Sequence, residues 1–469
     1  MKQTLLSLFA LLALSLPGQS QSFTQQASNL GASDRVLDIQ AIDANTAWGL
    51  AGPPAASGTY LRTTNGGATW QRGSLIPAGL TGYSAADLFA LNATTAFAVL
   101  NRSSAAGGGA VIVRTTNGGT TWTPVTTPGS AALAGTQFGA PDGFANSIHF
   151  FDAQNGVCMG DPNITPASAE RFFEVYTTSN GGTTWNRVPR SAGLSANNPE
   201  TGISRSYCAV GNTIWFTTYA KAISSSPGRV FKSTDRGLTW TSYDTNIPFS
   251  IGPITGIAFA NTNNGVAYTN GGTLNLSSDG GATWRDQTPR TPFRSSDVRA
   301  IPGGNTLVAV GPSRDVTSAS NSGASISRDY GATWLTLETG KDYSVVSFVS
   351  GTVGWAAGTP AAAGGSDIGK YTAVSILASR NAALQKSLVV YPNPSATGIF
   401  TVQLAPGLKS GATVRVLDVV GRQVVKQELD AAALAAKSTT IDLSKEKAGV
   451  YLLELRTDAG VAQQRLVVE

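Results

Sequence analysis

Thr63-Thr-Asn-Gly-Gly-Ala-Thr-Trp70 is one of six copies of an eight-residue pattern that recur along the chain. The other five are Thr115–Trp122, Thr178–Trp185, Ser233–Trp240, Ser277–Trp284 and Ser327–Trp334. Successive tryptophans of the pattern are separated by 44 to 63 residues. A repeat of about 50 residues, with short β-type segments between its copies, is typical of the blades of a β-propeller rather than of helical repeats.

A second, weaker pattern lies between these copies: an apolar strand, a turn, and a second strand that often holds glycine and an aromatic residue. It occurs seven times, for example at Asp38–Ala51 and Gly256–Tyr268. The seventh copy is followed by one more strand, Tyr371–Leu377, with no Trp-ended turn after it. We therefore predict an all-β fold with a seven-bladed β-propeller over residues 23–380. A strand from the N-terminal segment would complete the last blade and remove its free edges.

The eight-residue pattern has a simple structural explanation. Its third residue, Asn or Asp, accepts hydrogen bonds from the amides of a turn, and its fifth residue, always glycine, supplies a positive φ. Its tryptophan packs between blades. Three of the six third positions carry no charge, which argues against a ring of metal ligands. We interpret as structural the residues Asn65, Asn117, Asn180, Asp235, Asp279, Asp329, Trp70, Trp122, Trp185, Trp240, Trp284 and Trp334.

The pattern resembles the Asp box, or BNR repeat, of sialidase-like propellers, sortilin-type receptors and photosystem-assembly-factor-like proteins. This resemblance covers most of the chain and implies a propeller fold. Catalysis by a sialidase would require an arginine triad, a Tyr/Glu pair and an acidic aspartate. The Arg-Ile-Pro signature of that family is absent near the first blade, where Arg35-Val-Leu is the nearest string. Xyloglucan-type hydrolases place two catalytic aspartates between two propeller domains, whereas this chain is predicted to contain a single propeller.

Composition excludes several classes of function. The 469 residues include one histidine and two cysteines, which rules out multi-histidine metal sites and zinc ribbons, and we expect neither a metal nor a cofactor. The net charge of +5 gives no electrostatic reason to expect nucleic acid as a partner. Residues 1–22 hold a basic start, an apolar core and small residues, which predicts a secretory signal peptide. No later stretch is long and apolar enough to predict a membrane span.

The last part of the chain has a different pattern. After a predicted linker at residues 381–386, residues 387–469 contain six or seven short strands, which predict a small antiparallel β-sandwich. Tyr391-Pro-Asn-Pro394, Val414–Gly421 and Gly449–Leu455 resemble, in order and spacing, the type A C-terminal sorting domain of cargo for the type IX secretion system of Bacteroidota. This resemblance implies that the secretion machinery is a partner, that the domain is cleaved, and that the protein is secreted or held at the cell surface.

Few residues suggest catalysis. His149 lies within a predicted inner strand, where a core or channel-lining role is the simpler interpretation of a lone histidine. Cys158 and Cys208 lie in neighbouring predicted blades, and the sequence leaves open whether they form a disulfide or remain buried thiols.

Three long loops, residues 123–146, 161–172 and 186–205, are predicted on the face opposite the Asp-box turns. Loops grouped on one rim suggest a binding surface, although their charges could equally be ordinary solvated ones. The candidate rim residues are Asp142, Asp161, Glu170, Arg171, Arg190, Glu200, Arg205 and Tyr207. We expect a non-enzymatic module that binds an extracellular glycan or a surface protein. The alternative is a sialidase-like glycoside hydrolase, and a positioned carboxylate pair with a raised pKa would favour it. If the rim residues do not bind a ligand, the central channel near His149 is the alternative location for the binding site.

Overall fold

The computed structural model of the chain divides into two compact units, Met1–Ala373 and Val374–Glu469. It describes residues 22–469 except 29, 32–33, 54–56, 104–107, 126–142, 163–170, 198, 221–225, 288–291, 312–321, 360–365, 373–387, 405–411, 419–422 and 458–459. Most of the predicted signal peptide, the predicted linker, Asp142 and Glu170 lie outside the described residues.

The described residues of the first unit form seven antiparallel sheets, each built from four strands that follow one another in sequence or, in one sheet, from three such strands and the N-terminal strand. The first sheet consists of β2(Arg35–Ala41), β3(Ala47–Gly52), β4(Thr59–Thr63) and β5(Gln71–Ser74), and the second of β6(Tyr83–Ala90), β7(Ala96–Arg102), β8(Ala110–Thr115) and β9(Thr123–Pro124). The third consists of β10(Ala145–Phe150), β11(Gly156–Pro162), β12(Arg171–Thr178) and β13(Asn186–Arg187), and the short strand β14(Ser195–Ala196) also pairs with β12. The fourth sheet consists of β15(Thr201–Val210), β16(Thr213–Tyr219), β17(Pro227–Ser233) and β18(Thr241–Pro248), and the fifth of β19(Gly256–Phe259), β20(Gly265–Tyr268), β21(Leu274–Ser277) and β22(Arg285–Asp286). The sixth consists of β23(Asp297–Ala300), β24(Leu307–Gly311), β25(Gly323–Ser327) and β26(Leu335–Thr339).

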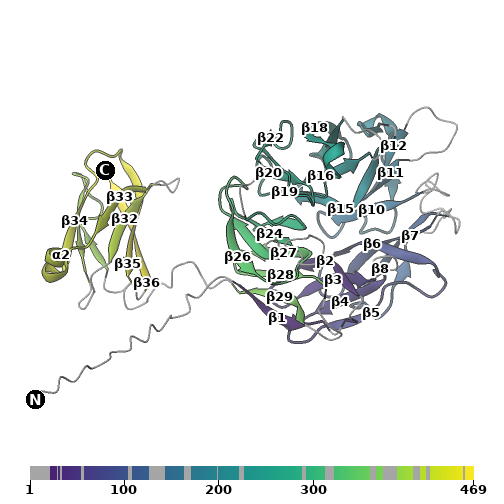
Figure 1. Ribbon diagram of the computed structural model, residues 1–469, viewed down its shortest axis with the longest axis horizontal. Coiled ribbons are helices and arrows are strands. Elements are labelled where there is room, and N and C mark those ends of the chain that lie inside the picture. Colours follow the sequence, from purple (N-terminus) through teal and green to yellow (C-terminus); the bar gives the residue numbers. More distant parts are fainter. Residues whose placement is uncertain are drawn as a thin grey trace, which may run out of the picture. The chain divides into compact units, whose positions relative to one another are not determined.

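The seventh sheet closes the ring. It consists of β27(Val345–Ser350), β28(Val353–Ala357), β29(Ser366–Thr372) and the N-terminal strand β1(Ser22–Ala27). β1 pairs antiparallel with β29, with Phe23 opposite Tyr371, and Figure 1 shows the purple β1 beside the green β29. The first strands of consecutive sheets contact one another in a closed cycle, from β2 through β6, β10, β15, β19, β23 and β27 back to β2. The sheets therefore radiate from a common centre, as the blades of a propeller do.

The core of the ring lies between blades. Each of seven apolar clusters joins one sheet to the next, and the Asp-box tryptophans take part in six of them. Trp215, for example, stacks on Phe259 of the following blade at 4.0 Å between ring centroids. A second strand such as β3 is buried along its whole length because neighbouring blades cover both its faces. This explains why these strands read as runs of small and apolar residues rather than as alternating ones.

The Asp-box turns are held by their own side chains. Asp279 accepts hydrogen bonds from the Thr283 amide at 2.9 Å and the Thr283 hydroxyl at 2.6 Å, and it receives one from Ser277 at 2.9 Å. Gly281 has φ +90°, a conformation that L side chains rarely adopt. Equivalent bonds reach Asn65, Asn117, Asn180, Asp235 and Asp329. In these turns the Asn and Asp side chains therefore accept hydrogen bonds that the backbone amides of the turn would otherwise lack.

The second unit contains two sheets over one apolar core. One sheet is β30(Val389–Tyr391), β31(Ile399–Gln403) and β34(Ser438–Asp442); the other is β33(Gln423–Glu428), β32(Thr413–Leu417), β35(Gly449–Thr457) and β36(Gly460–Val468). A short helix that the sequence analysis did not predict, α2(Ala431–Ala436), follows Asp430, whose carboxylate caps it by accepting the Ala433 amide. The predicted all-β fold class is confirmed. In the described part of the chain, no helix has the length and apolar character needed to cross a membrane.

Candidate functional site: the central channel

Two carboxylates predicted for the rim bind neighbouring segments of the fold. Glu200 is fully buried and forms an ion pair with Arg229, while its carboxylate also accepts the Asn197 amide at 2.9 Å. Asp161 accepts hydrogen bonds from Asn146 at 2.7 Å and from the Gly202 amide at 2.8 Å. Glu200 is therefore not an exposed rim residue, because its side chain is fully buried. Asp161 is partly exposed, and its oxygens hold two neighbouring segments together.

The other described rim residues separate into two groups. The guanidinium of Arg171 reaches the Glu200 carbonyl at 3.4 Å, and that of Arg190 lies over the ring of Phe172 at 5.5 Å. Arg205 and Tyr207, by contrast, line the centre of the ring. The strand β15 that carries them is the first strand of its blade, so it faces the channel and not the outer rim.

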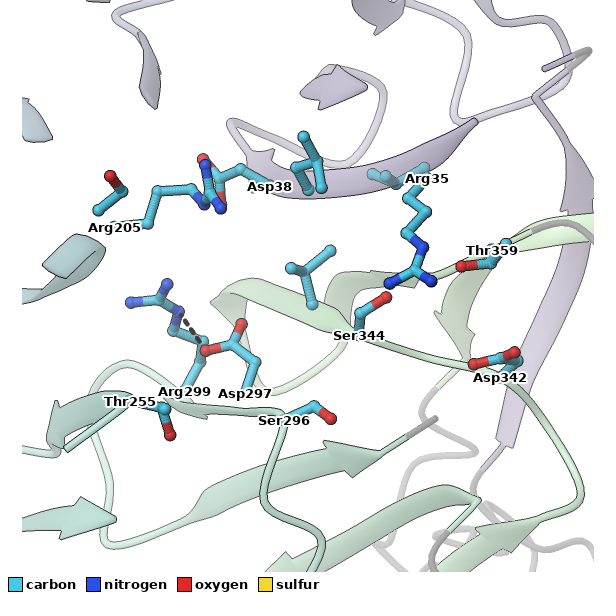
Figure 2. Close-up of a pocket in the computed structure, with 14 residues that line it drawn as sticks. Arg35, Asp38, Arg205, Thr255, Ser296, Asp297, Arg299, Asp342, Ser344 and Thr359 are labelled. Carbon is cyan, nitrogen blue, oxygen red and sulfur yellow. Dashed lines mark ion pairs between the residues drawn. The ribbon is translucent and has the colours of Figure 1, made fainter. Parts of the chain in front are cut away.

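The channel contains a polar cavity of about 180 Å³ at one of its openings, which we call the opening cavity. Figure 2 shows its lining, with Arg35, Asp38 and Arg205 on one side and Asp297, Arg299 and Ser344 on the other. Most of these residues lie at the starts of first strands, such as Arg35 in β2 and Asp297 in β23. Asp-box turns and the turns from first to second strands share the opposite face. The opening cavity therefore lies on the face that the sequence analysis selected, but in the ring's centre.

Farther along the channel lies a larger cavity of about 450 Å³, which we call the inner cavity. Three residues line both cavities: Asp38, Arg205 and Arg299. We call these three the charged layer. Asp38 directly follows a β-bulge in β2, and bulges are known to redirect side chains. The layer thus separates a polar opening from a more apolar interior.

Two further carboxylates at this level hold the ring together. Asp87 accepts the Leu88 amide at 3.0 Å and, across the blade boundary, the Ile148 amide at 2.9 Å. Asp297 accepts the Val346 amide of the next blade at 3.0 Å and pairs with Arg299 at 3.3 Å. Both carboxylates therefore bind a backbone amide on the first strand of the next blade.

The electrostatics of the channel follow from burial. Burial raises the pKa of Asp38, although the charges of Arg299 and Arg205 oppose this shift. Burial and the nearby charge of Asp38 raise the pKa of Asp87 well above its ordinary value. Burial would lower the pKa of Arg299, but the carboxylates of Asp297 and Asp38 outweigh it and keep this side chain a cation. Asp38 and Arg205 lie close enough to interact electrostatically, yet no ion pair joins them in the described structure.

His149 lies in the inner cavity, as a channel-lining residue, and meets the edges of three rings. Its centroid is 4.8 Å from that of Phe89, 4.9 Å from Phe151 and 5.7 Å from Tyr207. Burial lowers the pKa of His149 to about 3, so the imidazole is neutral at physiological pH. Cys158 and Cys208 are free thiols, and burial raises the pKa of both, which disfavours the reactive thiolate. Among the described residues, no group of three His, Cys, Asp or Glu side chains is arranged to hold a metal ion.

The sequence analysis did not select Arg35, Asp38 or Arg299 as binding residues. A signal was present, because Asp38 opens the predicted apolar segment Asp38–Ala51, where burial of a carboxylate is costly. What sequence could not show is that residues from blades far apart in the chain, such as Asp38 and Arg205, meet at one level of the channel.

Known structures offer distant likenesses. YCF48 bound to a D1 peptide is 16% identical, with a TM-score of 0.49, and the match covers 76% of this chain and 99% of that one. A GH74 enzyme of Niastella koreensis is 15% identical at a TM-score of 0.43, covering 93% and 66%. The Hadza microbial sialidase Hz136 is 11% identical at a TM-score of 0.39, covering 73% and 66%. No curated protein shows significant similarity to the chain.

The C-terminal unit gives a more definite result. Residues 389–469 match the family of secretion system C-terminal sorting domains. The match extends over the two sheets from β30 to β36. Such a domain implies sorting by the type IX secretion system and delivery to the cell surface or the extracellular space. The chain is therefore a β-protein that carries a C-terminal sorting domain of this family.

Proposed function

We propose that the mature protein is a non-enzymatic extracellular module that binds a glycan in the opening cavity of the propeller. The observation that carries the proposal is the lining of this cavity. It combines guanidinium groups, a carboxylate at Asp38 and the hydroxyl groups of Ser344 and Thr359. Sugar hydroxyls both donate and accept hydrogen bonds, so they suit a lining that mixes acidic acceptors with guanidinium donors.

The unpaired opposite charges of Asp38 and Arg205 strengthen this argument. Arg205 donates one hydrogen bond, to the Ala86 carbonyl at 2.5 Å, out of the five that a guanidinium can make. A pair of neighbouring sugar hydroxyls could accept from Arg205 and donate to Asp38 at once. Charge-assisted bonds of this kind are about twice as strong as neutral ones.

Binding is favoured over hydrolysis because glycosidases in general need two carboxyl groups free to act on the substrate. Asp87 and Asp297 already accept backbone amides, which leaves Asp38 in the charged layer. Two observations support a hydrolase as the second candidate: Asp342 also lines the opening cavity, and burial raises the pKa of Asp38. In Figure 2, however, Asp38 and Asp342 stand at opposite sides of the opening.

A glycan array run beside a screen of chromogenic glycosides tests the proposal. We expect a retained glycan, no turnover, and at least about tenfold weaker binding for Arg35→Ala, the usual scale for a lost hydrogen bond to a charged group. Arg285→Ala is the matched control, because Arg285 is exposed on β22, and it should bind like the wild type.

Three outcomes would contradict the proposal. Turnover that Asp38→Asn abolishes would make the protein a hydrolase. A glycan that binds Arg35→Ala normally would place the site elsewhere. Capture of a surface protein with no glycan retained would make the ligand a protein.

The proposed export route has its own test, which is independent of the ligand. Removing residues 387–469 should leave a folded propeller in the periplasm, because the two units have separate cores. Wild-type amounts of the truncated protein outside the cell would defeat the assignment of the sorting role.

A further inference from the structure

The inner cavity is a second, chemically different compartment of the channel. At about 450 Å³ it has the volume of pockets that hold small organic molecules. Its far end is lined by Val210, Ala260 and Pro302, which stand at or just beyond the ends of β15, β19 and β23. It is therefore approached from the Asp-box face, whereas the opening cavity is approached from the other face.

Aromatic side chains form one part of the wall of the inner cavity. Phe89, His149 and Tyr207 are partly exposed to it, and Phe348 contributes from another blade. The rings of Phe89 and Tyr207 meet His149 edge-on, at 75° and 67° between ring planes, so the three form one preassembled wall. Flat aromatic groups pack well against such a wall through offset and edge-to-face contacts.

The inner end of this cavity is the charged layer, and its hydrogen-bonding capacity is unequal. Arg205 donates one hydrogen bond, to the Ala86 carbonyl, and Arg299 donates one, to the Tyr207 carbonyl, beside its ion pair with Asp297. Each guanidinium has five N–H groups. On the acceptor side, both oxygens of Asp87 already accept amides, and Asp38 adds one carboxylate to the layer. Among the described residues, the N–H groups that the two guanidinium groups can still donate therefore outnumber the two oxygens of Asp38, which suits a ligand whose polar end accepts hydrogen bonds.

We infer that the inner cavity is a second binding site, for a small aromatic carboxylate whose ring lies against Phe89, His149 and Tyr207 and whose carboxylate meets Arg205 and Arg299. The carboxylate gains charge-assisted hydrogen bonds, and the ring leaves water for an apolar wall. This site is separate from the proposed glycan site in lining and in route of entry, and it shares with it only the charged layer.

Calorimetric titration of the full chain with 3-phenylpropionate tests the inference, and 3-phenylpropylamine is the matched probe with the opposite charge. We expect saturable binding of the acid and none of the amine. Absence of saturable binding by the acid, or equal binding of both probes, would overturn the inference.

Two variants separate this site from the glycan site. Ala260→Phe places a ring in the inner cavity and should weaken binding of 3-phenylpropionate at least tenfold, while leaving any glycan affinity unchanged. Ala153→Phe makes the same substitution at an exposed position of the turn between β10 and β11, outside both cavities, and should change neither. Arg35→Ala should affect the glycan alone, because Arg35 lines only the opening cavity.

A third variant guards against failure of Ala260→Phe to fold. His149→Ala removes one ring of the wall and should weaken 3-phenylpropionate about threefold or more, the scale of one lost aromatic contact. If melting temperatures show both variants folded and both bind the acid as the wild type does, the inner cavity is not the site. If Arg35→Ala loses glycan binding and still binds 3-phenylpropionate, the two sites bind their ligands independently of each other.

Discussion

Phe23→Ala should strongly destabilise the propeller, because this side chain anchors the strand that closes the ring. Phe23 is 3% exposed, and its ring lies 5.2 Å from that of Tyr343 and 5.4 Å from that of Tyr371. Truncation of a buried phenylalanine to alanine costs about 3–5 kcal/mol, from lost transfer energy plus the cavity left behind. We expect a loss within this range in the free energy of unfolding.

Urea unfolding followed by tryptophan fluorescence is the appropriate assay, since all nine tryptophans lie before residue 374 and report on the propeller unit. Thr24→Ala is the matched control: Thr24 is the next residue of β1 and is exposed, so its change should stay within about 0.5 kcal/mol. If Phe23→Ala lost less than about 1 kcal/mol, β1 would not be an integral part of the last blade, and the argument from ring closure would be refuted.

Three further predictions concern charge and turn chemistry. Glu200→Gln leaves Arg229 without its buried partner and should cost about 3 kcal/mol in urea unfolding, whereas Asp152→Asn, which breaks an exposed pair with Arg236, should cost less than about 1 kcal/mol; equal effects would contradict the role of burial. Asp279→Ala should lower the free energy of unfolding by about 1–2 kcal/mol without loss of ligand, and loss of ligand at an unchanged melting temperature would make the turn functional. The imidazole resonances of His149, the single histidine, should not shift between pH 8 and pH 5, because burial lowers its pKa to about 3. Since the unfolded chain takes up that proton near pH 6.5 and the folded one does not, the contribution of His149 to stability should fall as pH drops below 6.5; a titration of the folded protein near pH 6.5 would show the side chain to be solvated.

The candidate rim residues show what local sequence patterns can and cannot predict about the burial of a side chain. The loop between β13 and β15 contains Glu200, which was predicted from sequence as a candidate rim residue, with an ordinary solvated charge as the alternative, since charged residues in loops are usually exposed. Its partner Arg229 stands on β17, 29 residues later, and their meeting depends on how two segments of neighbouring blades pack. No local pattern reports a contact of that kind.

Sequence by itself determined the repeating architecture, because its signals are local. An Asx side chain, a glycine with positive φ and a tryptophan within eight residues define each turn, and the period of about 50 residues shows that the turns belong to repeated units. The sorting domain was likewise recognisable from residues close together in the chain, and residues 389–469 match its family. Tertiary structure alone decided the candidate site. Asp38, Arg205 and Arg299 belong to three different blades, and they share one level of the channel because a closed ring brings the first strand of every blade to its centre.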